Sequence, residues 1–394
     1  MAADKRRLKI AMVIDCFDDA CNGGVISTQR FVQLLRRKHD ITVVATGKLT
    51  EGKLVLPSFY PPFGRKKMQR INFVFAWPQT EKLRALFQQM DLVHVQFPFY
   101  LGIKATRIAN ELNVPVVSTF HVQAEHLLYN NGIRSPKWIN MLYRFFVNKI
   151  YNRSTVVICP SQFAETEIKH YGLTRPTQVI SNGILADYRP MAVKREERFN
   201  NKFCILSVGR FAAEKRQAII IEAIQRSQYE SKIQLILIGY GHKKEALQAK
   251  GKALTNPIEF LSLKADEIIP YYNLADLYVH AAEVEVECMT VLEAIACGLP
   301  PIIAASPKSA SKQFALDQRS LFKYDDVNEL TDKIGYWIEH ADELANAKKR
   351  YLAFAQEFNI DKSAEKLEAV YYQALQASLQ TASADYCEPM DNVS

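Results

Sequence analysis

Short apolar runs alternate with amphipathic stretches along the first half of the chain. The runs are typical of buried parallel strands, and the stretches between them have helical spacing. Strands are expected at 8–14, 41–45, 92–95, 116–119, 155–159 and 178–180. Helices are expected at 25–38, 81–89, 102–112, 136–151 and 161–171. This alternation predicts a doubly wound parallel sheet with helices on its faces.

The same pattern restarts after a polar and charged stretch. Strands are expected at 203–208, 234–238, 258–261, 277–280 and 301–304, and helices at 215–225, 266–274, 290–297, 328–340, 343–358 and 363–375. We therefore predict an α/β chain with two Rossmann-like domains that face a cleft. The predicted parts are a first domain over 1–187, a linker over 188–201, a second domain over 202–358, a last helix over 363–378 and a disordered tail over 379–394.

The composition fits a soluble globular protein, with 48% hydrophobic and 23% charged residues in 394 positions. The first 30 residues do not read as a secretory signal, and no apolar run reaches the length of a membrane-spanning helix. Seven cysteines without a CxxC pair fit the reduced cytoplasm better than a disulfide scaffold or a zinc site. The net charge of +8 is modest, so its placement matters more than its size.

The stretch EVECMTVLEAIACGLP, residues 285–300, carries the most specific chemistry. Glu285 precedes a predicted helix that starts near Thr290, and Glu293 lies just inside it. A helix N-terminus can hold a phosphate, and carboxylates beside it can accept hydrogen bonds from sugar hydroxyls. The layout thus indicates a sugar-nucleotide site. Thr290 and Glu293 also form a capping box, which needs no ligand, and the spacing leaves both readings open.

Two cations follow the strand predicted at 203–208. Arg210 comes directly after its end, and Lys215 follows five residues later. Ligands of parallel sheets bind beyond the carboxyl ends of the strands, so both side chains could neutralise a diphosphate. Two solvated surface cations are the plainer alternative.

His121 follows another strand, and Gly23 with Gly24 lies in a turn between the first strand and its helix. Each has a plainer reading, as a packed histidine and as a tight turn. The chain has no Asp-x-Asp triplet and no His, Cys and carboxylate set with metal-ligand spacing. We therefore expect neither a metal nor a cofactor.

These motifs together resemble the retaining glycosyltransferases of family 4, which have the GT-B fold. The resemblance is carried by Gly209-Arg210-x4-Lys215 and by the E-x7-E block from Glu285 to Glu293. Further matches are GGV at 23–25, TFH at 119–121, PSQF at 160–163 and SNG at 181–183. In this family the last helix crosses back onto the first domain, which suits residues 363–375.

The resemblance implies a role for each matching residue. Arg210 and Lys215 would bind the donor diphosphate, and Glu293 would hold the ribose hydroxyls. Glu285 would hold the donor sugar, which His121 would also face. The implied catalytic set is His121, Arg210, Lys215 and Glu285, and the other donor-binding residues are Gly23, Gly24, Cys288, Met289, Thr290 and Glu293. The family usually has a glycine-rich turn where this chain has Val286 to Met289, so the bulk there could change which sugar fits.

The first domain also contains basic and aromatic stretches that could form an acceptor or membrane surface. One includes Arg65, Lys66, Lys67 and Arg70; the other includes Trp138, Arg144 and Lys149 on a predicted amphipathic helix. Such a helix can lie on an anionic membrane, although an ordinary core-facing helix has the same pattern. No nucleic-acid motif accompanies the charge, so nucleic acid is not an expected partner.

The chain further resembles the bacterial branch that glucosylates diacylglycerol, notably over Lys308 to Phe322. This resemblance implies a peripheral enzyme at the inner face of the cell membrane, in the cytoplasm. It would move glucose or galactose from a nucleotide sugar, expected to be UDP-linked, to diacylglycerol or a ceramide-like lipid. The alternatives are a polysaccharide or soluble acceptor, a sugar-nucleotide epimerase, and a non-catalytic sugar-nucleotide binder. The hexose, base, lipid and oligomeric state are not determined by the sequence.

Overall fold

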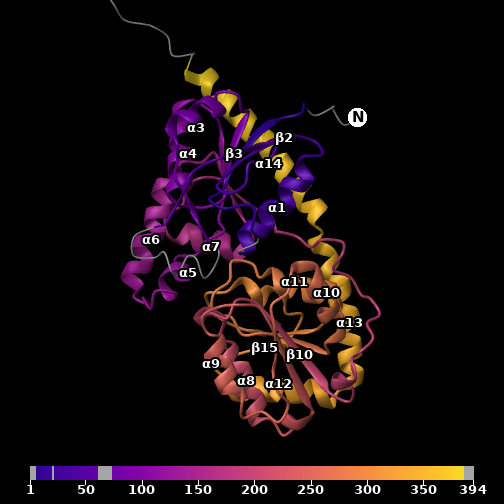
Figure 1. The fold of residues 1–394 in the computed structure, drawn as a ribbon. Coiled ribbons are helices and arrows are strands. Elements are labelled where there is room, and N and C mark those ends of the chain that lie inside the picture. The colour runs from indigo at the N-terminus through magenta and orange to yellow at the C-terminus, as the bar shows by residue number, and fades with distance from the viewer. Residues whose placement is uncertain (1–5, 20–21, 61–72, 386–394) are drawn as a thin grey trace, which may run out of the picture. The chain divides into compact units, whose positions relative to one another are not determined.

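The computed structural model describes residues 6–19, 22–60 and 73–385, with the side chains of 381–385 left aside. The chain divides into two compact units. Unit 1 comprises Met1–Val122, Pro136–Ile180 and Ser363–Ser394, and unit 2 comprises Gln123–Ser135 and Ser181–Lys362. Each unit has its own sheet, with helices packed around it (Figure 1).

Unit 1 is built on a seven-stranded parallel sheet. Its order is β3-β2-β1-β6-β7-β8-β9, with Ile10 of β1 opposite Ile41 of β2. The strands are β1 (Lys9–Val13), β2 (Asp40–Ala45), β3 (Lys53–Val55), β6 (Leu92–Val95), β7 (Val116–Thr119), β8 (Val156–Cys159) and β9 (Thr177–Val179). A separate antiparallel pair consists of β4 (Ser58–Phe59) and β5 (Phe75–Ala76).

The helices of unit 1 lie close to their predicted positions. They are α1 (Gly23–Leu35), α3 (Thr80–Phe87), α4 (Tyr100–Glu111), α6 (Pro136–Lys149), α7 (Gln162–His170) and α14 (Ile360–Asp385), with the 3-10 turn η1 (Tyr151–Arg153). Strands β3, β4 and β5, of two or three residues each, were not predicted, although β9 and β12, of three residues each, were.

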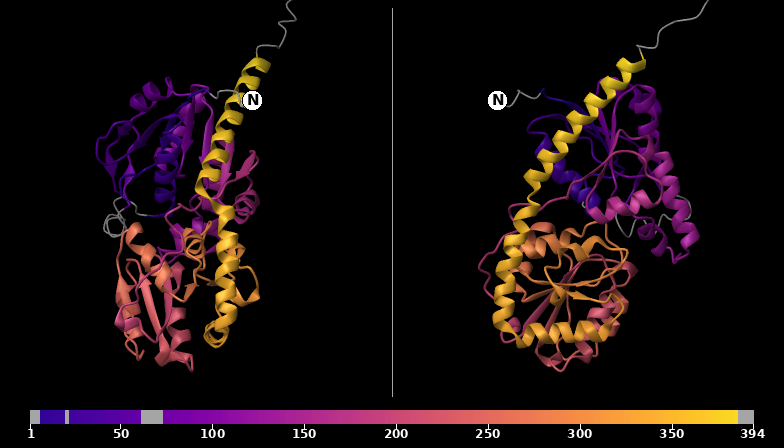
Figure 2. Two further views of the ribbon diagram at one scale, coloured as in Figure 1. Left: turned by 90° about the vertical axis from the view of Figure 1, so that its right-hand side faces the viewer. Right: turned by 180° about the vertical axis from the view of Figure 1, so that it is seen from behind.

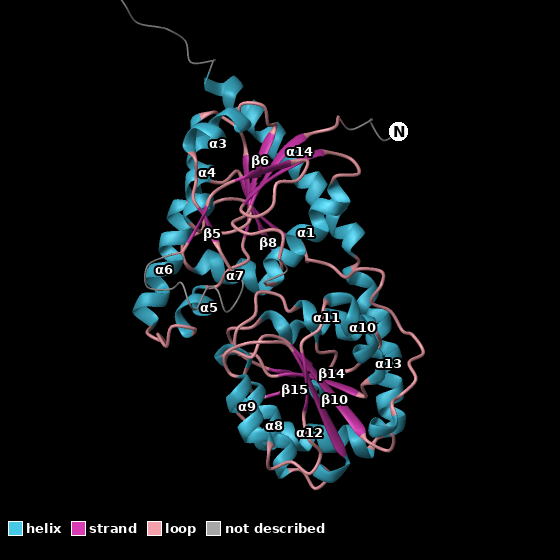
Figure 3. Cartoon of the chain, viewed as in Figure 1, coloured by secondary structure: helices cyan, strands magenta, loops and turns pink. Residues whose placement is uncertain are grey.

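Unit 2 contains a six-stranded parallel sheet in the order β12-β11-β10-β13-β14-β15. Its strands are β10 (Phe203–Val208), β11 (Ile233–Ile238), β12 (Glu259–Leu261), β13 (Leu277–His280), β14 (Pro301–Ala304) and β15 (Leu321–Phe322). Strands β10 and β11 consist almost wholly of buried residues, as expected for a sheet covered on both faces. Figure 3 shows these strands enclosed by helices.

The helices of unit 2 include two that were not predicted, α5 and α9. The set is α5 (Ala124–Tyr129), α8 (Gln217–Arg226), α9 (Lys244–Gly251), α10 (Ala265–Leu274), α11 (Met289–Ala296), α12 (Val327–Glu339) and α13 (Ala341–Ala355). Short 3-10 turns are η2 (Glu197–Phe199), η3 (Ala213–Lys215), η4 (Glu230–Lys232), η5 (Ala310–Phe314), η6 (Gln318–Ser320) and η7 (Gln356–Phe358). The predicted α/β architecture of two doubly wound parallel sheets is confirmed.

The last helix, α14, starts in unit 2 and belongs to unit 1 from Ser363 onward. Figure 2 shows it as the long yellow helix that runs along unit 1. Glu368 accepts a hydrogen bond of 2.8 Å from Lys38, and the hydroxyl of Tyr371 lies 2.8 Å from Nδ1 of His94. These contacts confirm that the last helix returns to the first domain.

The observed division differs from the predicted domains at three points. Residues 123–135 belong to unit 2 although they follow β7 of unit 1. Residues 181–201, predicted as the end of the first domain and the linker, are also part of unit 2. In addition, α14 continues to Asp385, so residues 379–385 are helical where a disordered tail was predicted. None of the helices in the described part of the chain is both long and apolar enough to cross a membrane.

Candidate functional site

The loop after β13 carries three buried glutamates at alternate positions, and each has different partners. Glu283 accepts hydrogen bonds of 3.0 and 3.1 Å from Arg134. Glu285 accepts one from Lys215 and lies 3.3 Å from Nε2 of His280. Glu287 accepts hydrogen bonds of 2.9 and 2.6 Å from the backbone and side-chain nitrogens of Asn182. Of the three, Glu285 is therefore the one that meets a predicted phosphate-binding cation.

The pair of Lys215 and Glu285 is charged on both sides. Burial acts to raise the pKa of Glu285, but Lys215 and His280 together outweigh it, and the pKa lies well below its ordinary range. Burial likewise acts to lower the pKa of Lys215, and the Glu285 carboxylate outweighs it. The pKa of His280 is lowered by burial, so its ring is neutral at pH 7. An ammonium and a carboxylate thus face each other beside a neutral imidazole.

Arg210 lies beside this pair, at the carboxyl end of β10. Its guanidinium donates a hydrogen bond of 3.1 Å to Glu214, which is fully buried. The pKa of Glu214 is lowered even though burial acts to raise it, since Arg210 offsets the burial. Strands β10 and β13 are adjacent and parallel, so the loops after both reach the same edge of the sheet. The structure thereby brings Arg210, Lys215 and Glu285 together.

Helix α11 begins beside these charges. Its N-cap residue is Cys288, with φ of 85° and no capping hydrogen bond from its side chain. The alternative in which Thr290 caps the helix is therefore wrong, because Thr290 already lies within the first turn. The first turn contains no acidic residue. No carboxylate of that turn therefore offsets the positive end of the helix dipole. Glu293 is buried and accepts a hydrogen bond of 3.1 Å from the hydroxyl of Tyr272.

His280, Glu285 and Cys288 form a compact cluster. The sulfur of Cys288 lies 3.3 Å from Nε2 and 3.6 Å from Nδ1 of His280. One ligand atom from each of the three residues falls within 4.8 Å of the others. These three residues are a candidate ligand set that was not predicted from the sequence. Its spacing, H-x4-E-x2-C, is unusual because the three residues lie on a strand end, a loop and a helix cap.

Glu287 connects the loop to the SNG segment at 181–183. Burial raises the pKa of Glu287 to about 7, although hydrogen bonds from Ser181 and Asn182 act to lower it. Gly183 has φ of 73°, and a Cβ there would lie 2.5 Å from the Cα of Ile360. Asn182 and Gly183 therefore hold the glutamate loop and the start of α14 within unit 2.

Two further segments hold the glutamate loop. The backbone nitrogen of Ala310 donates a hydrogen bond of 2.9 Å to the carbonyl of Glu285, and the hydroxyl of Ser306 donates one of 2.6 Å to that of Glu283. In the segment 123–135, Nε2 of His126 lies 3.3 Å from the carbonyl oxygen of Val284. The segment at 308–322, noted above for its resemblance to lipid-modifying enzymes, thus begins against the loop that carries Glu285.

The predicted site residues of unit 1 lie in a network of uncharged groups. Nε2 of His121 donates a hydrogen bond of 3.0 Å to Oε1 of Gln96. Burial lowers the pKa of His121 to about 4 and that of His94 to about 3, so both rings are neutral at pH 7. His94 is hydrogen-bonded to Thr119 at 2.7 Å. Two turn residues of the sequence analysis, Gly23 and Gly24, lie in the first turn of α1, after the N-cap Asn22.

Gly24 packs so closely on Phe97 that an added Cβ would lie 2.8 Å from its ring. The glycine there is consistent with close packing inside unit 1, as well as with the approach to a ligand that the resemblance implies.

Helix α6 has a buried face and an exposed apolar stripe. Ile139, Tyr143, Phe146 and Val147 are buried. Trp138, Met141 and Phe145 are 51%, 52% and 44% exposed and lie at helical spacing on the opposite face. Lys137, Arg144 and Lys149 are exposed beside this stripe. The other basic stretch, with Arg65, Lys66, Lys67 and Arg70, lies outside the described residues.

Sequence reasoning missed several side chains of the unit 2 site: Arg134, His126, Glu214, Tyr272 and His280. Two of them had a local signal in the sequence. His280 is the last residue of a strand, and Glu214 directly precedes Lys215. Arg134 and His126 had no local signal. They belong to the segment 123–135, which lies between two segments of unit 1 in the sequence but is part of unit 2.

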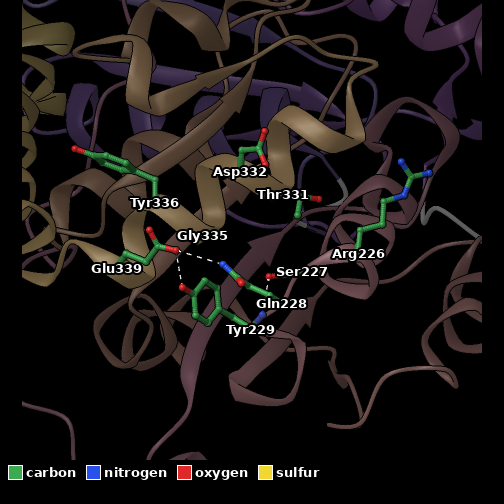
Figure 4. A pocket seen from close by; sticks show the side chains of 9 residues that line it. All are labelled: Arg226, Ser227, Gln228, Tyr229, Thr331, Asp332, Gly335, Tyr336 and Glu339. Carbon is green, nitrogen blue, oxygen red and sulfur yellow. Dashed lines mark hydrogen bonds between the residues drawn. The ribbon is translucent and has the colours of Figure 1, made fainter.

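A pocket of about 450 Å³ lies elsewhere in unit 2, between the end of α8 and helix α12 (Figure 4). It is lined by Arg226, Ser227, Gln228, Tyr229, Thr331, Asp332, Gly335, Tyr336 and Glu339. These residues lie near the start of β11, at the edge of the sheet opposite to Lys215 and Glu285. The pocket is thus distinct from the charged site.

Family models match most of the chain. The model described as Glycosyltransferase Family 4 matches residues 21–188, and the one described as Glycosyl transferases group 1 matches residues 190–352. The first match corresponds largely to unit 1 and the second to unit 2.

Curated relatives and solved structures agree with these matches. The chain is 30% identical over 236 residues to the alpha-monoglucosyldiacylglycerol synthase of Streptococcus pneumoniae, covering 56% of this chain and 53% of that protein. It therefore spans about half the length of that relative. It is 24% identical over 314 residues to the GDP-mannose-dependent alpha-mannosyltransferase of Corynebacterium glutamicum, covering 75% of this chain and 72% of that protein.

The structure of Anabaena HepE in complex with UDP-glucose is similar with a TM-score of 0.74 at 18% identity, over 93% of this chain and 100% of that one. This likeness concerns the fold. Together with the two family models and the paired parallel sheets, it leads to one assignment: the chain belongs to the glycosyltransferases of family 4 and has the GT-B fold.

Proposed function

We propose that this chain is a retaining hexosyltransferase. It moves glucose or galactose from a nucleotide sugar, UDP-linked, to the hydroxyl of diacylglycerol or a ceramide-like lipid at the cytoplasmic face of the membrane. The observation that carries the proposal is the unit 2 site, where Arg210, Lys215 and the start of α11 lie beside Glu285.

The donor diphosphate binds to the two cations and the helix N-terminus in this proposal. Lys215 has three N–H donors and Arg210 has five, so each can keep its carboxylate partner while it donates to a phosphate oxygen. The N–H groups at the start of α11 add the positive end of the helix dipole. Glu285 accepts from the sugar hydroxyls, and Glu293, held by Tyr272, accepts from the ribose.

Transfer proceeds by front-face displacement. The bond from the anomeric carbon to the phosphate oxygen breaks, a bond to the acceptor oxygen forms on the same face, and the acceptor proton passes to the departing phosphate. Arg210, Lys215 and the helix N-terminus stabilise the charge that builds on the diphosphate. Such preorganised groups contribute about 3–4 kcal/mol each in enzymes where one was removed. His121, as a neutral ring, contacts the donor sugar during turnover.

Two observations support a lipid acceptor. One curated relative is named an alpha-monoglucosyldiacylglycerol synthase. The exposed stripe of Trp138, Met141 and Phe145 on α6 is flanked by cations, which fits an amphipathic helix at an anionic bilayer surface. Aromatic and apolar side chains would enter the headgroup region while lysine and arginine meet lipid phosphates.

Flotation with liposomes tests the membrane part. The chain should float with vesicles that contain anionic phosphatidylglycerol and float less with neutral ones. Replacing Trp138, Met141 and Phe145 by serine should abolish flotation. Leu49→Ser, at a position 82% exposed elsewhere in unit 1, is the matched control and should float normally. Equal recovery in solution for all samples would contradict membrane binding.

Product analysis tests the chemistry. The chain is incubated with UDP-glucose, UDP-galactose or GDP-mannose and with diacylglycerol, ceramide or a soluble disaccharide. Free UDP and a new glycolipid are expected. Release of GDP from GDP-mannose would instead favour a mannosyltransferase. This is the second candidate, because the Corynebacterium relative is named a GDP-mannose-dependent alpha-mannosyltransferase. An epimerized sugar nucleotide, or binding without any product, would contradict the transfer.

A further inference from the structure

Three potential metal ligands converge in unit 2 on the face that holds the charged pair. His280 ends β13, Glu285 follows in the loop, and Cys288 caps α11. All three are buried, with exposed fractions of 3%, 8% and 5%. The proposed transfer chemistry assigns a role to the carboxylate of Glu285 but none to the imidazole of His280 or the thiol of Cys288.

Measured from Nε2 of His280, the distances to Cys288 and Glu285 match those between neighbouring ligands of a tetrahedral ion. Zinc binds Cys sulfur at about 2.3 Å and His nitrogen or carboxylate oxygen at about 2.0–2.2 Å, which places neighbouring tetrahedral ligand atoms roughly 3.3–3.6 Å apart. Nε2 of His280 lies 3.3 Å from Sγ of Cys288 and 3.3 Å from Oε1 of Glu285. The sulfur of Cys288 also lies 3.6 Å from Nδ1, so the imidazole has to turn about its Cβ–Cγ bond to aim Nε2 at the ion. All three ligand atoms fall within 4.8 Å of one another. Three protein ligands leave the fourth position open.

The backbone at Cys288 points to a role for its side chain. Cys288 has φ of 85° and ψ of 74°, a left-handed conformation that favours glycine. A residue with a Cβ is strained there, and such strain is found at ligand-binding positions more than elsewhere. Glycine would therefore fit this backbone conformation better than cysteine. The sulfur of Cys288 lies against the imidazole of His280, and imidazole is a common zinc ligand.

We propose that His280, Glu285 and Cys288 bind one zinc ion, and that zinc and the nucleotide-sugar donor exclude each other. The second half of this proposal rests on the proposed function, since it assigns the donor sugar to Glu285. When zinc binds, the Cys288 thiol gives up its proton to solvent and its sulfur coordinates as a thiolate. Glu285 exchanges its Lys215 partner for the metal, so Lys215 is a competing cation.

Cobalt tests the metal site without any sugar nucleotide. Co²⁺ titrated into the full chain should give one equivalent of tightly bound metal and a thiolate-to-cobalt absorption band. Cys288→Gly, which suits the positive φ, and His280→Gln should each lose the band. Cys297→Ala, at a buried cysteine that caps the other end of α11, should keep it. Lys215→Met should tighten cobalt binding, because it removes the competing ammonium.

Zinc inhibition tests the competition. With zinc at its dissociation constant, the apparent KM for the donor should rise about twofold while kcat at saturating donor stays constant. Unchanged cobalt spectra in Cys288→Gly and His280→Gln would overturn the site. Bound zinc that leaves the donor KM constant would overturn the exclusion. If no transfer is found, the proposed function fails, and the cobalt spectra still decide the metal site.

Discussion

The strand ends of the two units differ in charge. In unit 2, they carry ion pairs: Lys215 with Glu285, and Arg210 with Glu214. In unit 1, the ends of β6 and β7 carry neutral rings, because burial lowers the pKa of His94 to about 3 and that of His121 to about 4. The ion pair of Asp18 with Lys53 lies apart from them, after β1. The ends of β10 and β13 in unit 2 are therefore charged, whereas the ends of β6 and β7 in unit 1 are neutral.

This difference indicates that the two units bind different parts of the substrates. A fixed set of paired charges is suited to a diphosphate, because the cations are already held in place before a ligand arrives. A neutral, hydrogen-bonded network is suited to sugar or acceptor hydroxyls, which carry no charge. The comparison predicts that changes in unit 2 affect donor binding and leaving-group departure, and that changes in unit 1 affect turnover alone.

The largest effect is expected from the cations of unit 2. Arg210→Ala and Lys215→Ala should each lower kcat by about 100- to 1000-fold, since each removes a donor to the developing charge on the phosphate. Steady-state kinetics with UDP-glucose measure it. Lys252→Ala, at an exposed lysine of the same unit, is the control and should keep the original rate. A double variant at 210 and 215 that retained most of its turnover would refute the role of these cations.

A smaller effect is expected from unit 1. His121→Ala should lower kcat by roughly 10- to 100-fold, because the proposed function gives this ring a hydrogen-bonding contact with the donor sugar. Its Kd for UDP, measured by calorimetry, should stay the same, because the proposed function assigns UDP to unit 2. The pKa of His121 near 4 also means that its ring stays neutral and leaves no step in the kcat profile between about pH 6 and 8. Weaker binding of UDP by His121→Ala would contradict the claim that changes in unit 1 affect turnover alone.

The smallest effect concerns a feature that the units share, a buried carboxyl group. Burial raises the pKa of Asp15 in unit 1 and of Glu287 in unit 2 to about 7, from 3.8 and 4.5. Between those values the unfolded chain loses a proton that the folded chain keeps, so stability falls as pH rises and the loss is complete above about pH 7. Asp15→Asn and Glu287→Gln should each regain about 1–3 kcal/mol above pH 7.

Thermal unfolding between about pH 5 and 8 measures this gain, which should shrink toward the acid end of the range. Both replacements can still accept the backbone hydrogen bonds, from Ala76 at 3.0 Å and from Asn182 at 2.9 Å. Variants that follow the pH dependence of the original chain would show that these carboxyl groups do not titrate in this range.

The fold could be predicted from the sequence because its strands are long enough to show an apolar run. Strands such as β10 and β11 lie within one residue of their predicted ranges. The short strands β3 and β15 were missed, although β9 and β12, which are no longer than β3, were predicted. The polar helix α9 was missed because its apolar face is small, with Leu247 and Gly251 as its buried residues.

The site was partly predictable for a related reason. Arg210, Lys215 and Glu285 lie at strand ends, and the parallel topology brings strand ends together. The partners that hold them depend on packing between segments far apart in sequence, such as Arg134 on Glu283 and Asn182 on Glu287. The cluster of His280, Glu285 and Cys288 depends in addition on the positive φ of Cys288. A positive φ is expected from the sequence at glycine and not at cysteine.

The central claim is that unit 2 accepts negative charge as a hexose leaves its nucleotide. A crystal structure of the chain with bound UDP tests it most directly. We expect the phosphate oxygens within hydrogen-bonding distance of Arg210, Lys215 and the backbone of Cys288 to Thr290. A diphosphate that binds away from these groups would contradict the account.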